Sequence, residues 1–191
     1  MITFNLGSGD SVINNGVVYG DMVMKKNADK QEKSKKHTKE VYDVPQKSYE
    51  YDIAFSYASE QEPFVLRVAK LLDEMGIKVF VKPFEEQRFL AKDLHRETYK
   101  IYALSCRFIA CFISKEYWAK EIPRHEFSVG INRIKKEKRI CMIPVMMDET
   151  RPASLDPSIV YIDVASDDLT EMDVAGKMEA ILLEDQRMQG Q

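Results

Sequence analysis

The sequence predicts a three-layer α/β sandwich built on one five-stranded parallel sheet. Five short β-prone runs alternate with helical or polar stretches between residues 49 and 187, and such alternation is typical of βαβ units with right-handed crossovers. The run 107–113 is almost entirely apolar, as expected for a parallel strand that helices cover on both faces. We therefore expect a flavodoxin-like arrangement, preceded by a flexible N-terminal segment.

The first strand and the first helix are the clearest elements. Residues 51–56 form a short β-prone run, and a polar loop follows at 58–61. From residue 62, apolar side chains recur at helical spacing up to Met75, and Gly76 then marks the end of an amphipathic helix. The remaining elements are a strand at 77–81, a polar segment at 82–92, a helix at 93–105, a strand at 107–114, a helix at 121–137, strands at 139–146 and 159–162, and a closing helix at 169–183.

Two segments of different composition precede the domain, which we place at 49–187. Residues 1–24 form a leader rich in Gly, Asn, Ser and Val. In the charged stretch 25–48, seven lysines and three acidic residues precede Val41. Such a composition favours a solvated linker.

The overall charge is nearly balanced. The 28 basic and 31 acidic side chains give a net charge of -3, so there is no global attraction to nucleic acid or to an anionic membrane. No apolar run approaches the roughly 20 residues of a membrane-spanning helix, and the N-terminus lacks the order of a signal peptide. We expect a cytoplasmic protein that binds neither nucleic acid nor membrane.

Three cysteines, Cys106, Cys111 and Cys141, lie in or beside apolar strand-like runs. Their number is odd, and neither CxxC spacing nor a complementary pair of histidines accompanies them. Neither a disulfide nor a zinc site is therefore predicted. We expect three buried, reduced thiols and no metal.

Glu126 is the strongest candidate for chemistry. It lies in the run Ile-Pro-Arg-His-Glu-Phe at 122–127, soon after the apolar strand and the run Ser-Lys-Glu-Tyr at 114–117. Ligands of parallel sheets gather at the carboxyl ends of strands. Pro123 is expected near the first helical position, which places Glu126 close to the amino end, where the helix dipole favours a carboxylate. A glutamate that only complements the helix dipole is the alternative.

Other families with this architecture fit the sequence less well. A response-regulator receiver needs an Asp at the end of the third strand, where this chain has Ser114. The acid of the first strand, Asp52, stands at its beginning. No GxGxxG or GxxxxGK[ST] motif follows a strand, so a Rossmann or P-loop phosphate site is not predicted.

Five short motifs occur in an order that points to one family. They are Tyr-Asp-Ile-Ala-Phe-Ser-Tyr at 51–57, Gly-Ile-Lys-Val-Phe at 76–80, Lys-Asp-Leu at 92–94, Ile-Ser-Lys-Glu-Tyr at 113–117 and Pro-Arg-His-Glu at 123–126. Over residues 49–165 the chain resembles a TIR domain of the bacterial kind. It departs from the usual family pattern at 80–82, at 89–91 and at Ile122, where relatives commonly have Trp.

The resemblance implies an enzyme that cleaves the nicotinamide–ribose bond of NAD+, which is its substrate, without a further cofactor. Nicotinamide is already a cationic leaving group, so the enzyme mainly stabilises an oxocarbenium-like ribose. The resemblance gives this role to Glu126. Some members join the product into a cyclic ADP-ribose isomer, and the sequence leaves linear and cyclic products open. A role as an effector of bacterial anti-phage or cell-suicide defence is also implied.

Two other functions stay open. A non-catalytic TIR adaptor would bind other TIR domains through its surface. The absence of Trp at position 122 and of Trp-Gly at positions 90 and 91 favours it. A nucleoside deoxyribosyltransferase-like enzyme would share the sandwich and also cut an N-glycosidic bond. That enzyme needs a second acid as nucleophile, for which the sequence offers no candidate.

Seven further residues are expected to contact the dinucleotide. Ser56 and Tyr57 close the first strand at its carboxyl edge, where Ser56 could equally cap the following turn. Lys82 could approach the pyrophosphate or remain solvated. The rings of Phe80, Phe84 and Phe89, in or beside the loop after the second strand, could stack on adenine or on a neighbouring subunit. For Phe80, packing in the core is the alternative. Ile122 is the last candidate.

The histidines receive no catalytic role. His125 is next to Glu126 but points about 100° away around a helix, so a surface or supporting position is expected. His37 and His95 have no partners in the sequence that suggest a site.

Residues 1–24 also resemble bacterial amyloid-signalling motifs. Two β-prone triplets, at 11–13 and 17–19, flank Asn-Asn-Gly at 14–16, and such triplets can stack between chains. A templated stack would raise the local concentration of TIR domains, whose catalysis in this family depends on subunits that complete each other's pocket. We therefore expect self-association and an upstream sensor as a partner. A disordered leader is the alternative.

Overall fold

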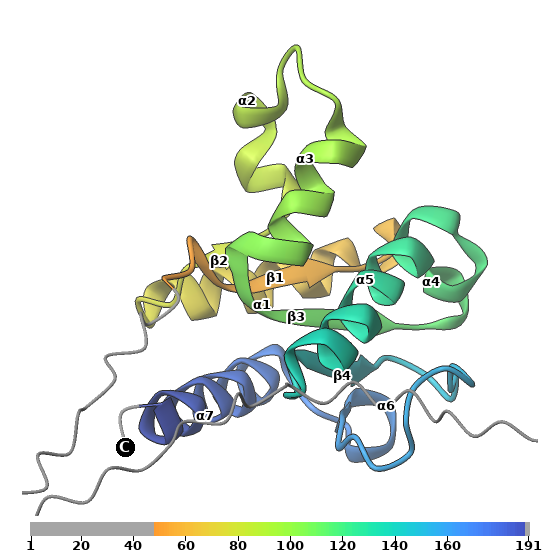
Figure 1. The fold of residues 1–191 in the computed structure, drawn as a ribbon. Coiled ribbons are helices and arrows are strands. Elements are labelled where there is room, and N and C mark those ends of the chain that lie inside the picture. Colours follow the sequence, from red (N-terminus) through yellow and green to blue (C-terminus); the bar gives the residue numbers. More distant parts are fainter. Residues whose placement is uncertain (1–47, 190–191) are drawn as a thin grey trace, which may run out of the picture. The chain divides into compact units, whose positions relative to one another are not determined.

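A computed structural model describes residues 48–189. Its core is a five-stranded sheet in which all neighbouring strands run parallel, in the order β2-β1-β3-β4-β5 (Figure 1). The strands are β1 (Tyr51–Ser56), β2 (Val79–Phe80), β3 (Cys106–Ile113), β4 (Met142–Met146) and β5 (Ile162–Asp163). This is the flavodoxin-like order, so the predicted fold class is confirmed. The leader at 1–24 and the linker at 25–48, apart from its last residue, lie outside the described residues.

Helices cover both faces of the sheet. On one face, α1 (Glu62–Glu74) and α7 (Glu171–Gln189) bury their apolar sides. The other face is covered by α4 (Lys115–Ala119), α5 (Glu121–Glu137) and the π-helical turn η3 (Ile101–Ser105), into which α3 (Leu94–Lys100) leads. Shorter elements are η1 (Ser59–Gln61), η2 (Lys82–Glu85), α2 (Glu86–Phe89) and α6 (Val164–Asp167).

The central strand β3 serves both layers. All its residues are buried, as the apolar run predicts. Side chains alternate between the faces of a strand, so Phe108 and Phe112 join the core under α1 and α7, whereas Ile109 and Ile113 join the core under α5. Helices on both sides therefore exclude water from the middle of the sheet.

The three cysteines are buried and unbridged, as expected. Within residues 48–189, no group of three or more His, Cys, Asp or Glu side chains is placed to hold a metal ion. None of the helices in this part of the chain is long and apolar enough to cross a membrane.

The observed elements differ from the predicted ones mainly at the sheet edges. Strand β2 covers only two residues of the predicted 77–81, and β5 begins where the predicted 159–162 ends. Each edge strand has one strand neighbour, so fewer ladder hydrogen bonds define its limits. The segment 82–92 contains η2 and α2 instead of a loop, and 93–105 divides into α3 and η3.

Two glycines have separate local roles in the domain. Gly76 has a φ of +80° immediately after α1, which is the left-handed conformation that ends many helices. A Cβ at Gly130 would overlap the terminal methyl group of Met142, so this flexible side chain would have to move if Gly130 were replaced.

The strand order creates a switch point between β1 and β3. The chain that leaves β1 enters α1 on one face, and the chain that leaves β3 enters α4 and α5 on the other. In sheets of this kind, ligands bind outside the carboxyl ends of the strands at such a point. The residues that end β1 and begin the following helices are therefore the first place to look for a site.

Candidate active site

Ser56 is the last residue of β1 and faces α5. Ile53 and Phe55 pack toward α1 and α7, and the alternation of the strand turns Ser56 to the other face. Its side chain is only 1% exposed, and its hydroxyl donates to Oε2 of Glu126 at 2.6 Å. The next helical turn, η1, has no side-chain cap, so the alternative of a turn cap is not what the structure shows.

Glu126 is buried, with 4% of its surface exposed. Helix α5 begins at Glu121, so Glu126 is its sixth residue and lies one turn deeper than the predicted first-turn position. Both carboxylate oxygens have partners, because Nζ of Lys82 donates to Oε1 at 2.7 Å. Side chains from β1 and from the turn after β2 therefore hold the carboxylate, rather than the end of its own helix.

A directed chain of hydrogen bonds leads to Glu126. Ser56 has a single hydroxyl hydrogen, which it donates to Glu126, so Tyr117 must be the donor in the 2.8 Å bond between the Tyr117 and Ser56 hydroxyls. Tyr117 is placed by Ser114, whose Oγ caps α4 by accepting the Tyr117 backbone N–H at 3.1 Å. The motif at 114–117 thus contributes to the site through Tyr117.

Three tyrosines around the carboxylate remain neutral. Burial raises the pKa of Tyr102 and of Tyr117 well above the usual value. Burial and the neighbouring Glu62 charge raise the pKa of Tyr57 as well. Tyr102 donates to a carbonyl oxygen of β1 at 2.8 Å, and Tyr57 donates to Oε2 of Glu62 at 3.2 Å. At neutral pH these phenols are donors and add no negative charge beside Glu126.

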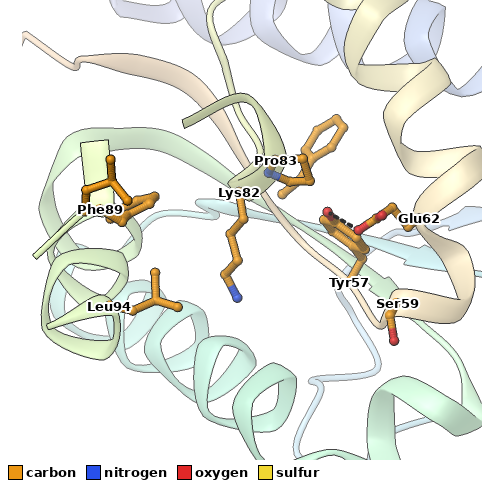
Figure 2. Close-up of a pocket in the computed structure, with 9 residues that line it drawn as sticks. Tyr57, Ser59, Glu62, Lys82, Pro83, Phe89 and Leu94 are labelled. Carbon is orange, nitrogen blue, oxygen red and sulfur yellow. Dashed lines mark hydrogen bonds between the residues drawn. The ribbon is translucent and has the colours of Figure 1, made fainter. Parts of the chain in front are cut away.

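A cavity of about 480 Å³, the β2-side cavity, opens beside the ion pair. Figure 2 shows the ammonium end of Lys82 between Phe89 and Leu94 on one side and Tyr57 on the other. Aromatic and aliphatic walls with a few charged groups are typical of sites for small organic ligands. The lining residues are Phe55, Tyr57, Ser59, Glu62, Lys82, Pro83, Phe89, Leu90 and Leu94.

A second cavity, the α3–α5 cavity, has a volume of about 730 Å³ and includes Glu126 in its wall. Tyr99 lines it from α3, and Ile122 and His125 line it from α5. Lys82 belongs to the β2-side cavity and is paired with Glu126. The ion pair therefore links a lining residue of one cavity to a lining residue of the other.

Residues 53–178 match the family described as TIR domain. That match covers more than half of the 191 residues. This chain belongs to the TIR domain family.

The TIR domain has a curated relative and a structural neighbour. The relative is the 3' cyclic ADP-D-ribose synthase AaTIR of Aquimarina amphilecti, which is 34% identical over 140 residues. The match covers 73% of this chain but only 42% of the length of AaTIR. The crystal structure of the TIR domain of the Toll-related receptor TRR-2 from Hydra magnipapillata superposes with a TM-score of 0.54 at 19% identity, over 72% of this chain and 98% of that one. This likeness shows the shared fold.

The TIR fold brings most of the predicted ligand residues together. Tyr57, Lys82 and Phe89 line the β2-side cavity, and Ser56 supports Glu126 beside it. Lys82 is in an ion pair rather than solvated. Ile122 lies apart from this group, 46% exposed in the wall of the α3–α5 cavity.

Two of the predicted aromatic residues line neither cavity. Phe80 is fully buried and packs edge-on against Phe89 and Tyr102, with ring centroids 6.0 and 5.9 Å away. Phe80 therefore packs in the core, which was the alternative, and the prediction that it contacts a ligand was wrong. Phe84 is 55% exposed, which leaves contact with a neighbouring subunit as its predicted role.

Several residues of the site were not among those predicted from the sequence. Glu62 and Leu94 line the β2-side cavity, and Tyr117 supports Ser56. Glu62 could have been predicted from the sequence, because it is the first residue of the helix that follows β1, at the carboxyl edge of the sheet. The contact between Tyr117 and Ser56 joins residues 61 positions apart, and no local pattern reveals it.

Proposed function

We propose that this TIR domain cleaves the nicotinamide–ribose bond of NAD+ and releases either ADP-ribose or a cyclic ADP-ribose. The observation that carries the proposal is Glu126, a buried carboxylate at the β1/β3 switch point, held by Ser56 and Lys82 in the wall of a ligand-sized cavity. The name of the relative AaTIR, a 3' cyclic ADP-D-ribose synthase, supports the same chemistry here.

The bond that breaks joins the pyridinium nitrogen of nicotinamide to C1 of the ribose. Its electron pair leaves with nicotinamide, which becomes neutral, and positive charge develops on the ribose. A carboxylate fixed beside the ribose stabilises that charge. Capture by water yields ADP-ribose and a proton, and capture by a hydroxyl of the same molecule yields a cyclic product and a proton.

Each partner of Glu126 has a distinct task in this reaction. Ser56 is a positioning residue, because it is buried and is itself held by Tyr117. Lys82 balances the negative charge of Glu126, and its side chain is the more exposed of the pair, at 34% against 5%.

We assign the cleavage of NAD+ to an assembly in which two or more copies of the chain contact each other. Phe84, Leu90 and Leu94 are 55%, 73% and 45% exposed, and two of them border the β2-side cavity. Grouped exposed apolar side chains mark interaction surfaces, so a second subunit that covers them would also close the cavity. An enzyme that consumes NAD+ only after assembly would suit the role of a bacterial defence effector. An upstream sensor would then trigger the assembly.

The proposal is tested by chromatography of NAD+ products over a series of protein concentrations. We expect nicotinamide together with ADP-ribose or a cyclic ADP-ribose, formed at a rate per subunit that rises with protein concentration. Glu126→Gln should lower the rate at least about a hundredfold, as loss of a transition-state contact does, without unfolding the protein. Glu184→Gln makes the same change at an exposed residue of α7 and should leave the rate unchanged. Full activity of Glu126→Gln would refute the proposal.

The alternative is a non-catalytic adaptor that works through association of TIR domains. The exposed apolar side chains favour it as much as they favour an assembled enzyme. The adaptor predicts self-association without consumption of NAD+ at any protein concentration. The same concentration series therefore decides between the two functions.

A further inference from the structure

Glu126 forms part of the wall of the α3–α5 cavity, but the reaction described above assigns no part of the substrate to this cavity. It is larger than the β2-side cavity, at about 730 against 480 Å³. Three helices contribute to it, with Tyr99 on α3, Trp118 on α4, and Arg124 and His125 on α5. A space of this size beside a reactive carboxylate is suited to part of a substrate.

Several aromatic rings line this cavity. The rings of Tyr99 and His125 lie with centroids 6.4 Å apart and planes inclined by 32°. Trp118 is held perpendicular to the buried ring of Phe127, at 5.4 Å, so the core fixes its orientation. Flat side chains of this kind stack on a heterocyclic base.

Charge distinguishes the two cavities. The α3–α5 cavity contains the guanidinium of Arg124 and two imidazoles beside the carboxylates of Glu121 and Glu126. The β2-side cavity contains Glu62, and its cation, Lys82, is already paired with Glu126. Arginine binds phosphate through its planar fork, whereas nicotinamide in NAD+ is itself a cation. Phosphate therefore fits the α3–α5 cavity better than the other one.

The bond to be cleaved must lie at Glu126, so the two halves of NAD+ extend to opposite sides of it. We propose that the α3–α5 cavity binds the adenosine phosphate half, with adenine against Tyr99, Trp118 and His125 and phosphate near Arg124. Nicotinamide then occupies the β2-side cavity. This assignment rests on the proposed cleavage of NAD+. It names the residues that would bind the adenosine phosphate half of that substrate.

The assignment has a consequence for the product. Adenosine that is bound in the α3–α5 cavity, next to Glu126, keeps the hydroxyls of its ribose close to C1 of the nicotinamide ribose. When the bond from C1 to nitrogen breaks and its electron pair leaves on nicotinamide, one of these hydroxyl oxygens forms the new bond to C1 and its proton passes to solvent. The α3–α5 cavity thus favours a cyclic product, and its variants should release a larger fraction of linear ADP-ribose.

Trp118 offers a direct test, because it is the only tryptophan in the sequence and it lines the cavity. The full chain carrying Glu126→Gln, which prevents turnover, is titrated with AMP or with nicotinamide mononucleotide while tryptophan fluorescence is recorded. AMP should quench the fluorescence, and the mononucleotide should change it little. Tyr99→Ala should weaken AMP binding about tenfold, as loss of one base-stacking ring does.

Two further variants sharpen the comparison. Tyr161→Ala is the matched control, since Tyr161 is 42% exposed against 49% for Tyr99 and lies over Arg151, away from this cavity. It should leave AMP binding unchanged. Arg124→Met should remove the difference in affinity between AMP and adenosine.

The proposal is overturned if AMP leaves the fluorescence unchanged, or if Tyr99→Ala weakens AMP and nicotinamide mononucleotide equally. It is also overturned if Tyr99→Ala in the active protein leaves both the KM for NAD+ and the ratio of products unchanged. Binding of AMP that depends on Tyr99, in a protein whose wild type consumes no NAD+, would instead refute the proposed cleavage and leave the adenosine phosphate site standing.

Discussion

Ser56→Ala is expected to lower the free energy of unfolding by about 3 kcal/mol. The hydroxyl is 1% exposed and donates to a carboxylate oxygen of Glu126 at 2.6 Å, and a hydrogen bond to a charged group contributes about 1.5–3 kcal/mol. The buried hydroxyl of Tyr117 loses its acceptor as well, which adds about 1 kcal/mol. For a domain of this size the melting temperature should fall by roughly 10 °C.

A double-mutant cycle with Glu126→Ala isolates the contact. In the absence of Glu126, Ser56 keeps only its bond to Tyr117, so Ser56→Ala should then cost about 1 kcal/mol. The coupling energy should therefore be about 2 kcal/mol, within the range for residues in contact. Urea unfolding of the four proteins, followed by circular dichroism, provides the four free energies. Tyr117→Phe, which removes only the outer hydroxyl, should cost about 1 kcal/mol.

Two results would contradict this reasoning. If Ser56→Ala costs the same with and without Glu126, the hydroxyl and the carboxylate do not interact, and the described geometry of the site is wrong. If the loss in the wild-type background is below about 0.5 kcal/mol, the hydroxyl must reach water in the folded protein, since a buried donor and acceptor pair is worth more than that.

Two further predictions concern parts of the domain outside the carboxylate. Burial raises the pKa of Cys106 and Cys111 to about 12, so both should resist a thiol reagent at pH 8 until the protein unfolds; rapid labelling of the native protein would contradict this.

The second prediction concerns the pH dependence of stability at Asp148. Burial tends to raise the pKa of Asp148, but backbone N–H donors from Lys115 and Thr150 outweigh this effect and lower that pKa. A lowered folded-state pKa stabilises the protein above the usual carboxyl pKa of about 4, and the effect is lost as the pH falls. Asp148→Asn should therefore cost about 1 kcal/mol at pH 7 and less as the pH falls below about 4, measured by urea unfolding. A cost that is the same at every pH would contradict this prediction.

The central part of the fold was predictable because its signals are local and strong. The apolar run 107–113 is β3, and the apolar spacing from residue 62 to Gly76 is α1. The edges of the sheet were less predictable, since β2 and β5 are two-residue strands with one neighbour each. The short helical turns within 82–92 span too few residues to show a helical period.

The candidate site was predictable only in part. The order of motifs and the end of a buried strand were enough to single out Glu126. Its partners Ser56 and Lys82 are 70 and 44 residues away in the sequence, and the prediction placed them near a ligand rather than on the carboxylate. His125 received no role, because a helical angle of about 100° from Glu126 does not reveal that α3 lies opposite and that both residues line one cavity.

The sequence by itself determined the TIR family, the order of strands and helices, and the residue on which the chemistry is proposed to depend. These follow from periodicity and from motif order, which are properties of neighbouring residues. Tertiary structure alone decided which groups hold Glu126 and which spaces it borders. The alternation of β1 turns Ser56 toward α5, the turn after β2 brings Lys82 to the same carboxylate, and the packing of α5 beside α3 creates the second cavity. Such contacts depend on where separate elements meet, so no stretch of the chain carries them alone.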